Sequence, residues 1–345
     1  MIAAGGTVIS SVFSERIIKR FGTGLVTLVS VFMTAAALLC ISFTTSAVLV
    51  IICAVPLGLG AGSVDAALNN YVALHFKARH MSWLHCFWGV GASVGPLIMS
   101  FHLAGGSSWN SGYRTIGIIQ ISLVIILILS LPLWKKDKIE KDSQKNEPMS
   151  FKKIFSVIGV KPALVAFFCY CALETTCGLW GASYLVMEKE MQPETAARWI
   201  ALFYIGITAG RFISGFITMA LNNRQMIRLG QIIIGCGILT LVLPFENSSL
   251  PGLFLIGLGC APVYPSMLHE TPRNFGKDFS QAIMGVQMGC AYIGSTIMPP
   301  IFGWVTSFLG FKIFPVFLGV ILAVNIIMIK ILNKKISSLS KSSSL

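Results

Sequence analysis

Long apolar segments alternate with short polar ones along almost the whole chain. A helix needs about 20 apolar residues, rising about 1.5 Å each, to cross a hydrocarbon core of about 30 Å. Segments of this kind lie near residues 1–16, 24–44, 46–74, 81–103, 115–134, 161–187, 195–221, 225–244, 250–270, 280–308 and 311–332. The pattern therefore predicts an all-α integral membrane protein, a bundle of about 11 transmembrane helices.

The predicted spans form two groups that are similar in sequence. Residues 6–21 align without a gap on residues 206–221, which matches Gly6 with Gly206, and "GLGAG" (58–62) has a counterpart in "GLGCA" (257–261). A duplicated bundle is typical of secondary transporters, whose solute sites lie near the membrane midplane between the repeats. We expect an N-terminal bundle over residues 1–134, a charged cytoplasmic linker over 135–160, a C-terminal six-helix bundle over 161–333 and a cytoplasmic tail over 334–345.

Charge is scarce and unevenly placed. The chain has 26 Lys and Arg against 13 Asp and Glu, a net charge of +13, but the basic residues cluster between apolar runs rather than along one polar face. This excludes a nucleic-acid footprint and favours a topological signal, with the Lys- and Arg-rich loops in the cytoplasm. We expect a multi-pass monomer in the lipid bilayer of a cell membrane, specifically a bacterial cytoplasmic membrane.

Several motifs recur in an order that is known from one family. They are "SERIIKRFGTG" (14–24), "GAGSVDAALNNYV" (60–72), "LHCFWGVGASVGP" (84–96), "ALETTCGLWGASYLV" (172–186), "GITAGRFISG" (206–215), "GLGCAPVYPSML" (257–268) and "QAIMGVQMGCAYIGSTIMPPIFG" (281–303). In this order the chain resembles the major facilitator superfamily, and more narrowly its fucose-permease-like sugar:proton symporter branch. The resemblance implies six plus six helices that work by alternating access.

The opening segment resembles the second helix of that family, so the resemblance implies that the first helix is absent. Two explanations stay open at this point: a truncated gene or misplaced start codon, and a genuine protein of eleven spans.

Asp65 interrupts an apolar run, at a cost of roughly 2.5 to 3.5 kcal/mol for a carboxylate near the centre of a membrane helix. Asn69, one turn later, shares its helix face, and Asn70 follows. His85 and Trp88 occupy similar depths on the next, antiparallel span. We expect these groups to converge on one cavity wall, where Asp65 binds and releases a proton, as the acid at the matching position does in the resembled family. The alternative is that Asp65 only holds helices together by hydrogen bonds.

Glu174 lies near the centre of its span, with Tyr170 one turn before it and with Trp180 and Tyr184 forming a further pair spaced by four residues. Carboxylates accept hydrogen bonds from sugar hydroxyls, and sugar C–H faces stack on aromatic rings. We expect Glu174 to be a solute acceptor or a second proton site, and the aromatic residues to bind solute. Packing or an interfacial belt is the alternative for the aromatic residues.

Arg211 lies about ten residues from the cytoplasmic end of its predicted span. We expect it to act as a gate or in an ion pair, with contact to the solute as the alternative. Arg16 and Arg20 are expected to have gating or structural roles.

Tyr264 lies between Pro262 and Pro265, where we expect a broken helix that lines a cavity. Gln287 is a candidate ligand for a solute hydroxyl. For both Tyr264 and Gln287, packing in the protein interior is an equally good alternative. His269 and Glu270 fall at a loop edge, where solvation is expected.

The sequence favours proton-coupled uptake of a sugar or similar small polar solute. Efflux of amphipathic compounds and a truncated, non-transporting remnant stay open as alternatives. No metal, nucleotide or prosthetic group is implied, and no enzyme is expected, because no metal-binding pair and no nucleophile beside a base stands within a span. The expected partners are a small-molecule solute, protons and lipid.

Overall fold

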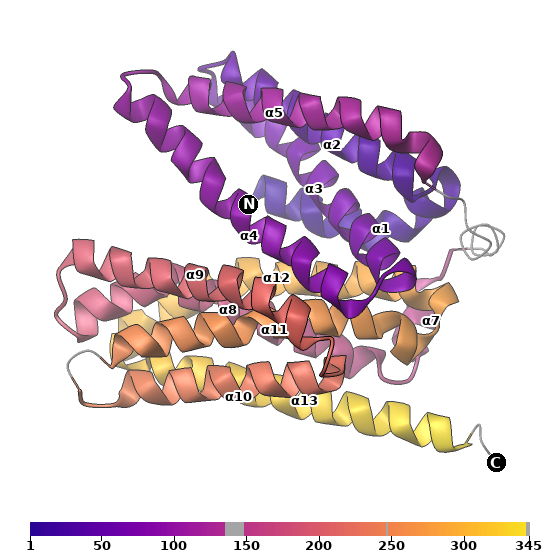
Figure 1. Cartoon of the computed structure of the whole chain (residues 1–345). Helices are drawn as coiled ribbons and strands as arrows, with labels where there is room; N and C mark the ends of the chain where they lie inside the picture. Colours follow the sequence, from indigo (N-terminus) through magenta and orange to yellow (C-terminus); the bar gives the residue numbers. More distant parts are fainter. Residues whose placement is uncertain (135–147, 246–247, 343–345) are drawn as a thin grey trace. The chain divides into compact units, whose positions relative to one another are not determined.

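The protein is described here from a computed structural model covering residues 1–134, 148–245 and 248–342. Within these ranges the chain is helical and contains no strand (Figure 1). The long helices are α1 (Ile2–Phe21), α2 (Thr23–Ser42), α3 (Ala47–His75), α4 (Ala78–Ala104), α5 (Trp109–Ser130), α8 (Val160–Glu188), α9 (Pro193–Ile217), α10 (Asn223–Val242), α11 (Ser249–Phe275), α12 (Lys277–Leu309) and α13 (Phe314–Ser342). Three short helices connect them: η1 (Leu131–Leu133), α7 (Phe151–Ser156) and η2 (Phe311–Ile313). Each predicted span coincides with one long helix, which confirms the predicted bundle.

Nine helices in the described residues are long and apolar enough to cross a membrane. Of the eleven long helices, α1 and α12 fall outside this set. The end of α1 carries Lys19 and Arg20, and α12 contains glycines, Pro299 and Pro300. Charged residues, glycines and prolines lower the mean hydropathy of these two helices.

The chain divides into two compact units. The first contains Met1–His75, Val90–Ile154 and Phe275–Gly289, and the second contains the remaining residues. Helices α4 and α12 are therefore shared, because each contributes one end to each unit. The boundaries expected from the sequence assign each of these helices to a single bundle.

Both units use the same contact between two of their helices. A Cβ atom on Gly58 of α3 would collide with the carbonyl of Ala3 in α1, and a Cβ atom on Gly257 of α11 would collide with the carbonyl of Phe203 in α9. Ala3 and Phe203 occupy corresponding positions of the two halves, as Gly58 and Gly257 do. Glycine thus allows two backbones to touch at the same place in each unit. The similarity of the two halves is therefore a similarity of packing as well as of sequence.

The expected linker is only partly visible, since residues 135–147 lie outside the described ranges. Met149 is buried, and its backbone N–H donates to both carboxylate oxygens of Glu15, at 3.2 and 3.3 Å. Lys19 pairs with Glu15 at 2.7 Å. The segment before α7 is therefore held on α1, and Glu15 is buried because it has these partners.

Candidate functional site

A buried ion pair lies inside the second unit. Glu174 is midway along α8, about 21 Å from either helix end at 1.5 Å per residue. Its Oε1 lies 3.5 Å from Nη2 of Arg211 in α9, with 14% of the Glu174 side chain and 4% of the Arg211 side chain exposed. A pair at this depth is costly to desolvate, so charge pairs within spans are typical of solute or ion pathways.

The beginning of α4 covers the guanidinium of Arg211. Nη1 donates to the backbone carbonyl of His85 at 3.3 Å, and the guanidinium lies 4.9 Å from the ring centre of Trp88. His85 is buried, whereas 56% of Trp88 is exposed within the chain. The indole therefore has one face on the cation and further surface for another contact.

Two tyrosines form the other side of the site. The hydroxyl of Tyr170 donates to the carbonyl of Cys260 at 2.8 Å, and its phenol also interacts with Glu174 and Arg211. The ring of Tyr264 lies 5.5 Å from that of Tyr170. It also makes an edge contact at 5.2 Å with the His85 ring. The polar pair is thus surrounded by aromatic groups from α4, α8 and α11.

The prediction of a broken helix at Tyr264 is wrong, because α11 continues through Pro262 and Pro265 to Phe275. A proline removes one backbone donor, but the helix continues when neighbouring groups satisfy the local carbonyls.

The ion pair leaves hydrogen-bonding capacity unused. A charge-assisted contact is usually about 2.7 to 2.9 Å long, so a single contact of 3.5 Å is loose. Nε of Arg211 is buried and has no hydrogen-bond partner among the described residues. A buried donor without a partner costs about 1 to 3 kcal/mol. A solute hydroxyl could accept from this group, and the pair as a whole is electrically neutral.

Asp65 has a different environment, in the first unit. Nδ2 of Asn69 donates to Oδ1 of Asp65 at 2.8 Å and to its backbone carbonyl at 2.9 Å. Asp65 is half-buried and Asn69 is buried. The structure thus brings Asp65 and Asn69 together, whereas His85 and Trp88 belong to the second unit. Their convergence with Asp65 stays a prediction.

Of the other predicted site residues of the first unit, Asn70 and Gln287 are buried, whereas Arg16 and Arg20 are exposed. Asn70 is buried and accepts from Oγ of Ser280 in α12 at 2.8 Å. Gln287, also on α12, is 1% exposed. Arg16 and Arg20 are exposed on α1 and stack on Phe13 and Phe21, respectively, at 5.2 and 5.4 Å.

Trp180 and Tyr184 contact residues other than Glu174. Nε1 of Trp180 donates to the carbonyl of Pro299 at 2.9 Å, and the hydroxyl of Tyr184 donates to the carbonyl of Leu241 at 3.1 Å. Tyr184 is 2% exposed and stacks on Phe314 at 4.9 Å. Both residues have the contacts expected of helix packing.

Sequence reasoning predicted the wrong environment for Glu270 and did not identify Glu15 as a buried carboxylate. Glu270 was expected to be solvated, but it is 3% exposed, because α10 and α11 supply charged and polar partners. Asn223 donates to it at 3.1 Å, and Arg224 and Arg273 each lie 3.5 Å away. His269 accompanies it, 2.9 Å from Asn223. The basic residues near both helix ends were the available signal, but their pairing depends on tertiary structure.

The described residues contain no cluster of His, Cys, Asp or Glu that could hold a metal ion.

The chain is similar to known transporters in both sequence and structure. The glucose/mannose transporter of Bacillus subtilis is 23% identical over 273 residues, which is 74% of this chain and 65% of the relative's length. The fucose:proton symporter of E. coli aligns with a TM-score of 0.78 and 16% identity over 96% of this chain and 91% of the symporter. The proton:xylose symporter aligns with a TM-score of 0.78 and 10% identity, over 98% and 87% of the two chains.

The three relatives described above are transporters rather than enzymes, which agrees with the expectation from the sequence. The family model of the Major Facilitator Superfamily matches residues 1–268 and 178–343. The chain belongs to the Major Facilitator Superfamily.

Proposed function

We propose that the protein takes up a sugar, or a similar small polar solute, together with protons, by alternating access in a bacterial cytoplasmic membrane. The Lys- and Arg-rich loops face the cytoplasm in this proposal. Sugar transport by the Bacillus relative and proton symport by the two structural neighbours support it.

The observation that carries the proposal is the Glu174–Arg211 pair beside Trp88 and Tyr170. A sugar hydroxyl both donates and accepts, so it can accept from the free N–H of Arg211 and donate to Glu174. The exposed surface of Trp88 can stack on the C–H face of a sugar ring. An anionic solute would compete with Glu174 for Arg211, so the neutral pair favours a neutral solute.

Proton entry with the solute can be measured directly. Monosaccharides are added one at a time to lightly buffered cells that express the chain, and the external pH is recorded. We expect alkalinisation with one sugar, abolished by a protonophore. If no sugar changes the external pH, in cells whose membranes contain the full chain, the result would contradict proton-coupled sugar uptake.

The role of Glu174 is tested with Glu174→Gln in the same cells. Loss of the carboxylate should raise the half-saturating sugar concentration or abolish the pH response. Glu188→Gln is the matched control, because Glu188 lies exposed at the end of the same helix. Equal behaviour of the two variants would remove Glu174 from the site.

A further inference from the structure

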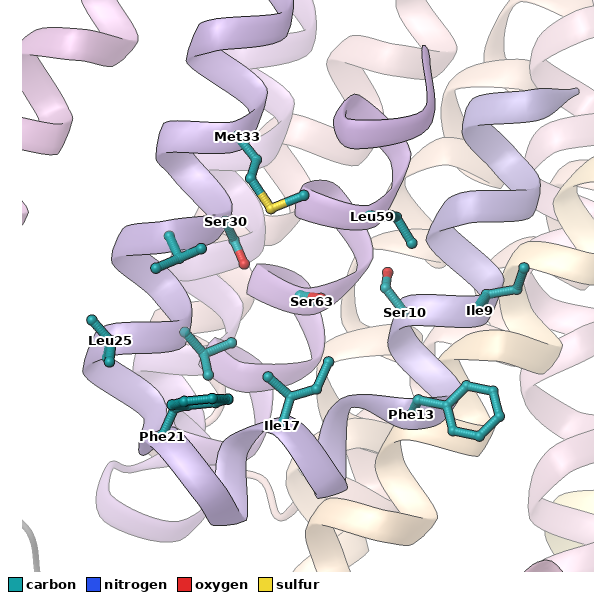
Figure 2. A pocket seen from close by; sticks show the side chains of 12 residues that line it. Ile9, Ser10, Phe13, Ile17, Phe21, Leu25, Ser30, Met33, Leu59 and Ser63 are labelled. Atoms are coloured by element: carbon teal, nitrogen blue, oxygen red, sulfur yellow. The ribbon is translucent and has the colours of Figure 1, made fainter. Parts of the chain in front are cut away.

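An apolar groove runs along one face of the first unit (Figure 2). It has a volume of about 400 Å³. Helix α1 lines one side with Phe13, Ile17 and Phe21, and α2 lines the other with Leu25 and Val29. These side chains are between 37% and 50% exposed, so the groove opens to the surroundings of the chain.

Small residues on α3 create the groove. α1 and α2 both pack along α3 and contact each other far less. A Cβ atom on Gly60 would lie 2.7 Å from the Ser30 carbonyl of α2, and one on Gly62 would collide with Thr7 and Ser10 of α1. Both neighbours are therefore drawn close to α3, and the space between them is left open, with Leu59 and Ser63 of α3 as its floor.

The length of the groove matches one leaflet of a membrane. From Phe21 to Ile9, α1 rises about 18 Å. Half of the hydrocarbon core measures about 15 Å. The groove begins beside Gly22, at the turn between α1 and α2. This turn is on the Lys- and Arg-rich side of the chain, so the groove occupies the cytoplasmic half of the bilayer.

Positive charge lies along the α1 wall of the groove. The guanidinium of Arg20 lies 5.4 Å from the ring of Phe21, at the cytoplasmic end, whereas that of Arg16 lies 5.2 Å from the ring of Phe13, which is about 12 Å further along α1. Both arginines are exposed, so Arg20 can meet a lipid headgroup while its stem stays on the apolar wall, and Arg16 adds positive charge nearby. An apolar groove with a guanidinium at its end is complementary to an acyl chain attached to a phosphate.

We propose that this groove binds one acyl chain of an anionic phospholipid of the cytoplasmic leaflet, with the phosphate held by Arg20 and attracted by the charge of Arg16. The bound lipid covers apolar side chains of α1 and α2 and bridges the two helices. This site is separate from the Glu174–Arg211 pair, so the proposal does not depend on the transported solute.

Native mass spectrometry of the purified, delipidated full chain tests the proposal. The chain is titrated with an equimolar mixture of phosphatidylglycerol and phosphatidylcholine that carry the same acyl chains. We expect one tightly held phosphatidylglycerol. Each basic residue near a membrane surface changes the affinity for anionic lipid about fivefold. The double variant Arg16→Gln, Arg20→Gln should therefore reduce the preference by a factor on the order of tenfold or more.

Matched variants separate the groove from other surfaces. Lys334→Gln with Lys335→Gln removes two exposed charges from α13 and should keep the preference. Val29→Trp fills the groove from a side chain that is 46% exposed, and should displace the lipid, whereas Ile232→Trp, at a 65% exposed position of α10, should not.

Three results would overturn the proposal. Equal binding of both lipids would show that the headgroup is not recognised. An equal loss in both double variants would show that net charge alone attracts the lipid. Undiminished phosphatidylglycerol binding by a folded Val29→Trp variant would show that the lipid binds elsewhere on the chain.

Discussion

The two units hold their intramembrane carboxylates in different ways. Asp65 in the first unit receives a hydrogen bond from Asn69, one turn away on the same helix. Glu174 in the second unit faces Arg211, which comes from the next helix. The contact between Asp65 and Asn69 is local and its donor is a neutral amide, whereas the contact between Glu174 and Arg211 joins two opposite charges.

This difference separates two functional requirements. When a carboxylate that accepts from a neutral amide gains a proton, the amide donor is not left with an unbalanced charge. A carboxylate that faces a buried guanidinium is needed in its ionised form, because an unpaired charge in the interior is costly. The first arrangement suits proton exchange, and the second suits a fixed polar contact for a solute.

The comparison is tested most severely by Arg211→Met. The change leaves Glu174 buried without its cation, so we expect a loss of about 3 to 5 kcal/mol in the free energy of unfolding. Thermal unfolding of the purified variant in detergent measures the effect.

The double variant Glu174→Gln, Arg211→Met is the control for this loss. It removes both charges and should recover most of the stability, since apolar or neutral replacements of a buried pair are often tolerated. A double variant as unstable as Arg211→Met would show that the charge pairing is not the cause.

The glycine contact that the two units share should give the next largest change in the free energy of unfolding. Gly58→Ala and Gly257→Ala each place a methyl group against a backbone carbonyl of the neighbouring helix, so each should cost about 1 to 3 kcal/mol. Thermal unfolding again measures the change. Gly5→Ala and Gly319→Ala are matched controls, because nothing lies within 4 Å of a Cβ atom at either position. Unequal losses at Gly58 and Gly257 would argue against equivalent packing in the two units.

Much of the fold could be predicted from the sequence, because lipid imposes a simple rule on each segment. A span must be apolar over its whole length and must satisfy its own backbone, so the helices appear directly in the pattern. The glycines that pack helices together could also be found from the sequence, because Gly58 and Gly257 occupy corresponding positions of the repeat.

The candidate site was harder to predict, because helix periodicity does not specify which helices are neighbours. Glu174 and Arg211 were both identified, but they stand 37 residues apart and the sequence contains nothing that pairs them. Tyr184 shows the same limit, since a tyrosine near a span end fits an interfacial belt as well as the buried position it has. The contact between Asp65 and Asn69 could be predicted because it lies within one helix.

Variants of two tyrosines test which residues belong to the site around Glu174 and Arg211 in the second unit. Tyr170→Phe and Tyr184→Phe each remove one hydrogen bond to a backbone carbonyl, of Cys260 and Leu241, so each should cost about 0.5 to 1.5 kcal/mol. Only Tyr170→Phe should also raise the half-saturating sugar concentration, because its phenol interacts with the ion pair. Sugar uptake and thermal unfolding of both variants check this, and an equal change in affinity would widen the site beyond Tyr170.

Asp65→Asn should have the smallest effect on stability and a complete effect on coupling. The amide oxygen can still accept from Asn69, so we expect a change in unfolding free energy within about 0.5 kcal/mol. An amide cannot exchange a proton, so sugar-dependent alkalinisation and accumulation should disappear, while exchange of preloaded sugar continues. Asn69→Ala is the companion variant, because it removes the donor and keeps the carboxylate. Accumulation at the wild-type level in Asp65→Asn would exclude Asp65 from coupling.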